Sequence, residues 1–155
     1  MKRLTTALAT TLAMTMATPG WAGSAATAET PLVRQYLAIH ARLAADSAAG
    51  VEESAKAVAA AARKAAPAAA DRSRMERIAA AAEGLHGRDL TKLRAGFEEL
   101  SREMAAWAEV VGVAGVGLYY CPMAKAHWLQ AAGPVKNPYY GSSMLACGAR
   151  AEAVR

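Results

Sequence analysis

The sequence predicts an all-α fold, an up-and-down four-helix bundle with an irregular C-terminal cap that contains cysteine and methionine. Three observations support this prediction. The 155-residue chain is 54% hydrophobic but only 6% aromatic, because alanine, the best helix former, supplies most of the apolar side chains. Valine and isoleucine are few, which argues against a large sheet. Four segments with helical spacing of apolar residues follow one another through short connections.

The first two predicted helices span residues 31–45 and 51–66, with a turn at 46–50 between them. Thr30 provides a helix start, since threonine can cap a helix and the proline that follows it fits the first helical position. One apolar stripe then recurs at spacings of four and three: Leu32, Tyr36, Ile39 and Leu43.

The third and fourth predicted helices span residues 71–85 and 90–111. The fourth has the strongest pattern, because its apolar residues alternate spacings of three and four as in a bundle seam. These residues are Leu90, Leu93, Phe97, Leu100, Met104, Trp107 and Val111. His40 and His86 fall on or beside helices, and we expect both at the surface or at a helix end rather than as ligands.

The first 22 residues have the features of an export signal. Lys2 and Arg3 precede an apolar, uncharged run over residues 4–18, and cleavage is expected after Ala22, or alternatively after Ala28. The run is too short to span a bilayer core of about 30 Å. We therefore expect a mature chain that is not inserted in a membrane and lies in the periplasm, an oxidising compartment.

The predicted organisation is a flexible leader over residues 23–30, one helical domain over 31–148, and a tail over 149–155. Within the domain, the bundle covers 31–111 and the C-terminal cap covers 112–148. Loss of Lys2 and Arg3 with the signal would leave 16 of the 18 basic side chains against 13 acidic ones, a net charge of +3. Such a mild charge does not indicate a nucleic-acid partner. Phosphate-binding loops, serine elbows and HExxH or CxxCH motifs are absent from the sequence, so we do not expect an enzyme.

Soft metal donors are concentrated in the C-terminal cap. Cys121 and Met123 lie two residues apart, His127 follows four residues later, and Met144 and Cys147 form a second Cys/Met pair. A helix over residues 123–130 would place Met123 and His127 on one face. Thiolate and thioether ligands select copper(I) and similar soft ions. The sequence therefore favours these five residues as candidate metal ligands.

A structural explanation competes with the metal site. Two cysteines in an oxidising compartment often form a disulfide, and closing a loop of about 26 residues would stabilise the fold by about 3.5 kcal/mol in the chain-entropy model. Cys121 and Cys147 are thus also candidates for a disulfide, with both methionines as packing residues. Other residues of the segment are expected to shape the cap through aromatic packing and a turn. They are Trp128, Asn137, Pro138, Tyr139, Tyr140 and Gly141.

Three segments of the chain resemble a known family. They are YCPMAKAHWLQ at 120–130, NPYYGSSMLACG at 137–148 and RAGFEELS at 94–101. Together they resemble a bacterial domain of unknown function that occurs at the C-terminus of CusB/HlyD-type membrane-fusion proteins of copper and heavy-metal efflux systems, and also as short secreted proteins. The resemblance covers about residues 31–148. It implies a role in copper or heavy-metal handling, with Cys121, Met123, Met144 and Cys147 as motif positions.

Together these features predict a periplasmic protein that binds a soft metal, copper(I), in copper or heavy-metal homeostasis or efflux. Its partners would be the metal ion and an efflux-system or other envelope protein. We expect the site where the C-terminal cap meets one end of the bundle, with the sulfurs converging. The alternative is a disulfide-stapled helical interaction domain that docks on an envelope or efflux partner without metal. Oligomeric state stays open.

Overall fold

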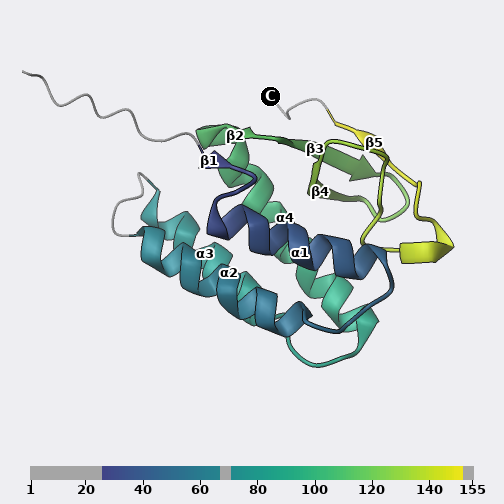
Figure 1. Cartoon of the computed structure of the whole chain (residues 1–155), viewed down its shortest axis with the longest axis horizontal. Helices are drawn as coiled ribbons and strands as arrows, with labels where there is room; N and C mark the ends of the chain where they lie inside the picture. The colour runs from purple at the N-terminus through teal and green to yellow at the C-terminus, as the bar shows by residue number, and fades with distance from the viewer. Residues whose placement is uncertain (1–25, 67–70, 152–155) are drawn as a thin grey trace, which may run out of the picture.

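The computed structural model describes residues 26–66 and 71–151 (Figure 1). The predicted signal peptide at residues 1–22 lies outside the described residues. So do residues 152–155 of the predicted tail. Within the described ranges, no helix is both long enough and apolar enough to cross a membrane.

All four predicted helices are present, and their ends differ from the predicted ones by two residues at most. They are α1 (Pro31–Ala44), α2 (Val51–Ala65), α3 (Arg72–Glu83) and α4 (Leu90–Val111). Each helix packs against the next one along the chain. The predicted seam of α4 is fully buried at Leu93, Phe97, Leu100 and Met104. At its end the seam becomes exposed, since Val111 is 43% exposed.

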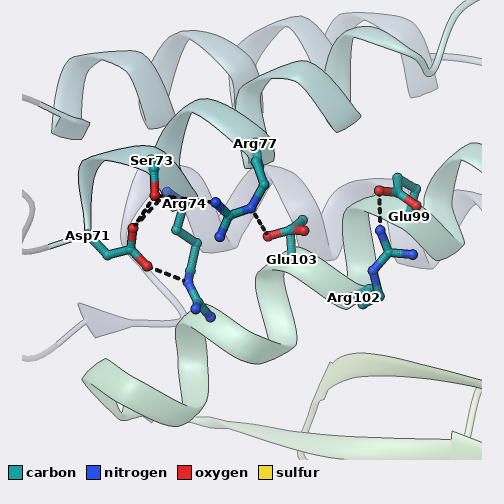
Figure 2. A network of polar contacts seen from close by, with 7 residues as sticks. All are labelled: Asp71, Ser73, Arg74, Arg77, Glu99, Arg102 and Glu103. Atoms are coloured by element: carbon teal, nitrogen blue, oxygen red, sulfur yellow. Dashed lines mark hydrogen bonds and ion pairs between the residues drawn. The ribbon is translucent and has the colours of Figure 1, made fainter.

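Side-chain oxygens cap the last two helices. The Asp71 carboxylate accepts from the backbone N–H of Arg74 at 2.9 Å, and Asp89 accepts from two amides at the start of α4, as good N-cap residues do. Figure 2 shows the ion pairs around the first of these caps and along α4. One of them, between Arg77 and Glu103 at 3.0 Å, joins α3 to α4.

The remaining described elements are five strands and a short 3-10 turn, most of them in the C-terminal cap. Strand β1 (Ala26–Thr27) pairs in parallel with β2 (Val113–Ala114). A hairpin of β3 (Val116–Cys121) and β4 (Ala126–Ala131) pairs in antiparallel register, with Tyr119 opposite Trp128. Strand β5 (Ala149–Arg150) adds to the other edge of β3, so the sheet order is β4-β3-β5. A short 3-10 turn, η2 (Gly141–Ser143), lies between β4 and β5.

The prediction of an all-α four-helix bundle is therefore wrong, and the fold is mixed α/β. The expected helix over residues 123–130 is also wrong, because Ala126–Ala131 form β4. Whole-chain composition concealed the sheet, since alanine in the helices outweighs a short local run of valine and aromatic residues. Strands also occupy parts of the expected leader and tail, namely β1 and β5.

The hairpin packs along the side of the helices, on α4 and α1 (Figure 1). Aromatic rings connect the two parts. Phe97 of α4 stacks on Tyr36 of α1 at 5.0 Å between ring centroids and also contacts Tyr139 at 6.1 Å. Tyr139 meets the edge of Trp128, which stacks on Tyr119 in turn. Because these buried rings are continuous from helix to sheet, the two parts share one core.

Candidate metal centre

The structure brings together the two cysteines of the C-terminal cap. Cys121 ends β3, and Cys147 lies two residues before β5, the neighbouring strand. Pairing of Tyr120 with Ala149 sets the register that places the two thiols side by side. Their Sγ atoms are 3.0 Å apart. Cys121 is fully buried, whereas Cys147 is partly exposed.

Both cysteines are free thiols in this structure. The predicted disulfide is therefore not present. A bonded pair of sulfurs lies about 2.05 Å apart, whereas these two sulfurs are 3.0 Å apart and form a hydrogen bond instead.

The pKa values of the two thiols are shifted in opposite directions. Burial raises the pKa of the Cys121 thiol, but hydrogen bonds from Cys147 and from the backbone amides of Ala124 and Met123 outweigh burial, so its pKa is lowered. The pKa of Cys147 is raised, first by its hydrogen bond with Cys121 and then by burial. Of the two, Cys121 is therefore the thiol that loses its proton first, and its thiolate would accept a hydrogen bond from the Cys147 thiol.

Asn137 organises the segment that supplies Cys147. Its side chain is fully buried, and its Nδ2 donates to the carbonyl of Cys147 at 2.8 Å. Its Oδ1 accepts from the backbone N–H groups of Tyr139 and Tyr140 at 2.8 and 3.3 Å. A further hydrogen bond from the Asn137 amide helps to lower the pKa of Cys121. The turn predicted at Asn137 therefore also positions the thiols.

The other predicted turn residues fix the same segment. Tyr139 donates its hydroxyl to the carbonyl of His127 at 2.5 Å, and the Tyr140 hydroxyl donates to the carbonyl of Met123 at 3.3 Å. The carbonyl of Pro138 accepts from Arg94 Nε at 3.0 Å. Gly141 has a φ of 55°, which lies in the left-handed region that favours glycine.

The remaining predicted ligands occupy separate positions around the thiols. Met123 lies in the hairpin turn, where its backbone amide faces both thiols while its side chain is 61% exposed. Met144 is half-buried, and its carbonyl accepts from the Cys147 amide at 2.9 Å. His127 pairs across the hairpin with Tyr120, and their rings are 4.6 Å apart. Since Cys121 pairs with Ala126, alternation places the His127 side chain on the opposite face from Cys121.

Sequence reasoning missed a clamp that holds residues 138–142 against the helices. Arg94 donates to the Asp46 carboxylate at 2.5 Å and to the carbonyl of Leu43 at 3.1 Å. Asp46 also accepts from the backbone N–H of Ser142 at 2.9 Å. A hydrogen bond from the Ser142 side chain, this backbone bond and the ion pair with Arg94 lower the pKa of Asp46 to about 2. The conspicuous RAGFEELS segment was an available signal, since it contains Arg94.

His40 corrects another expectation. Its side chain is only 4% exposed, and Nε2 donates to the carbonyl of Lys136 at 2.8 Å. Burial lowers the pKa of His40 to about 4, so the imidazole is neutral at pH 7. His86 is exposed as expected.

Tyr36 also joins the helices to the cap. Its hydroxyl forms a hydrogen bond with the Ser101 hydroxyl at 2.7 Å and accepts from the backbone amide of Leu129 in β4 at 3.1 Å.

The donor set at the thiols fits a soft metal better than a hard one. Over residues 26–66 and 71–151, no three His, Cys, Asp or Glu side chains gather closely enough to hold a metal ion. An ion at the thiols would thus be bound by two thiolates, with methionine thioethers as the nearest additional donors in the sequence. Sulfur-only coordination of low number suits copper(I) and does not suit magnesium or calcium.

In comparisons with known proteins, the chain matches no family model, no curated protein and no solved structure.

Proposed function

We propose that this protein binds a soft metal ion, copper(I), through Cys121 and Cys147 and acts in copper or heavy-metal handling in the periplasm. The observation that supports this proposal is the contact of two free thiols, 3.0 Å apart, from segments separated by 26 positions in the chain. The role is binding and delivery to an efflux-system or other envelope protein, without a chemical reaction. The family resemblance of the motifs around both cysteines points to the same role.

The geometry needs a small adjustment to accept the ion. Metal–thiolate bonds of about 2.3 Å, as in zinc sites, place two sulfurs on a tetrahedral ion about 3.8 Å apart. Binding must therefore move the sulfurs apart from their separation of 3.0 Å. Cys147 is the residue that can move, because it is partly exposed and lies in a loop, whereas Cys121 is buried at the end of β3.

Methionine supplies the proposed third donor. Met123 is adjacent to the thiols through its backbone, and its largely exposed side chain is free to turn toward them. Met144, in the same segment as Cys147, is the other candidate. His127 is a weaker candidate, since its ring packs on Tyr120 on the opposite face of the hairpin from Cys121.

A copper(I) competition experiment tests the proposal. The reduced protein is titrated against a chromogenic copper(I) chelator, together with the Cys121→Ser and Cys147→Ser variants. Ala146→Ser is the matched control, because Ala146 is exposed beside Cys147. We expect one ion per chain in the wild type and in the control, and loss of binding in both cysteine variants. Failure of the reduced wild type to compete for copper(I) would refute the proposal.

Methionine variants then identify the additional donor. Met123→Leu and Met144→Leu keep the side-chain size but remove the thioether. We expect Met123→Leu to weaken copper(I) binding while the thiols still hold the ion. Unchanged affinity in both variants would show that the two thiolates bind the ion without methionine.

A further inference from the structure

A large apolar groove lies at the end of the helices where α1 and α3 begin and α2 and α4 end. Its volume is about 830 Å³. Its lining is mostly aliphatic and aromatic and includes Leu32, Ala65, Met75, Trp107, Val110 and Val111. None of these residues belongs to the candidate metal centre, so the groove is a separate feature of the molecule.

The groove exists because the apolar seam of α4 continues to Val111, beyond the part that the other described elements cover. Met104 is fully buried, but Val110, less than two turns later, is 75% exposed and Val111 is 43% exposed. Trp107 lies between them and is only partly buried. Exposed apolar side chains gathered in a concave surface mark a binding site.

Charged side chains line one side of the groove. Arg74 pairs with Asp71 at 2.8 Å, and the same carboxylate accepts from the Arg74 backbone amide, as Figure 2 shows. This pair is neutral as a unit. Lys64, near the end of α2, also lines the groove and is exposed. The described lining residues therefore give this side a net positive charge.

We propose that this groove binds a small amphiphile with one apolar chain and an anionic head group, such as a medium-chain carboxylate. A volume of about 830 Å³ lies within the range of about 300–1,000 Å³ that is usual for small-molecule sites. The aliphatic floor takes the chain of the ligand, and Lys64 pairs with its head group. Cleavage after Ala22 would leave only residues 23–25 before Ala26, too short a segment to fill the groove.

Calorimetric titration with sodium dodecanoate, kept below its micelle concentration, tests the site. We expect saturable binding of one molecule per chain with a negative heat-capacity change, the mark of apolar burial. Val110→Asp places a charge in the apolar lining and should weaken binding more than about tenfold. Because Val110 is 75% exposed, this variant should fold. Lys92→Glu, at an exposed position near the opposite end of α4, is the control and should bind like the wild type.

The head-group preference needs a second comparison. Lys64→Glu should weaken dodecanoate binding by about threefold to tenfold, because it replaces an attractive surface charge with a repulsive one, and should leave dodecanol binding unchanged. No saturable dodecanoate binding, or equal binding by wild type and Val110→Asp, would overturn the proposal. Equal dodecanoate binding by wild type and Lys64→Glu would overturn the proposed preference for an anionic head group.

Discussion

At position 40, an imidazole is buried where a surface side chain was expected from the sequence. The His40 ring is buried and donates through Nε2 to the Lys136 carbonyl, which joins α1 to the C-terminal cap. A carbonyl can only accept, so the neutral ring must carry its proton on Nε2. Burial lowers the pKa of His40 from 6.5 to about 4, and the positive charge of Lys136 contributes in the same direction. One residue thus links the folding of the cap to pH.

We predict that His40 makes the protein less stable in mild acid. Between pH 6.5 and pH 4, the unfolded chain binds a proton at this residue that the folded chain does not. Stability is therefore lost as pH falls through this window, by an amount on the order of 3 kcal/mol. Urea unfolding at pH 7, 5.5 and 4.5 measures it. His40→Gln keeps a donor for Lys136 but cannot titrate, so its stability should fall less. Equal falls in both proteins would contradict the prediction.

At the scale of elements, the helices could be predicted from the sequence, but side-chain contacts between residues far apart in the chain could not. Each of these helices has its own apolar stripe, and α1, α3 and α4 also begin at a proline or a capping aspartate. Neighbouring residues in the sequence therefore set their limits. The Arg94–Asp46 pair joins positions 48 apart, and no periodicity indicates such a contact. The hairpin was missed because residues 123–130 were interpreted as a helix with Met123 and His127 on one face, whereas Ala126–Ala131 form β4. The candidate site was partly predictable, since the two cysteines converge, but the contribution of Asn137 depends on tertiary contacts.

We predict that Gly141→Ala will loosen the segment that supplies Cys147. An added Cβ would overlap the Asp46 carboxylate and the Arg94 guanidinium, and alanine is also strained at a φ of 55°. We expect a loss of roughly 2–5 kcal/mol from strain and crowding together. Gly87→Ala is the control, because Gly87 has a φ of 83° but open space around it, so only strain of about 1–2 kcal/mol applies. Thermal or urea unfolding measures the free energy of unfolding of both variants. Equal losses would show that the Asp46 and Arg94 side chains do not restrict residue 141.

At the scale of the whole molecule, a small sheet lies along one side of a helical scaffold (Figure 1). Both parts contribute to one core that contains aromatic side chains. The N-terminal segment also contacts the end of the scaffold. Strand β1 pairs with β2, which directly follows α4. The Thr30 hydroxyl donates to the carbonyl of Thr27 at 2.7 Å and so fixes the start of α1. Residues 26–30 therefore belong to the folded domain rather than to a leader.

This arrangement distinguishes the two signal cleavage sites expected from the sequence. Cleavage after Ala28 would remove β1 and the carbonyl that Thr30 uses, whereas cleavage after Ala22 would leave both in place. We therefore predict that the exported protein begins at Gly23. The intact mass of protein from the periplasm of a Gram-negative host measures this. Ala22→Asp, which removes the small residue that the peptidase requires, should leave the signal attached. A mature chain that begins at Glu29 would contradict the prediction and show that the domain folds without β1.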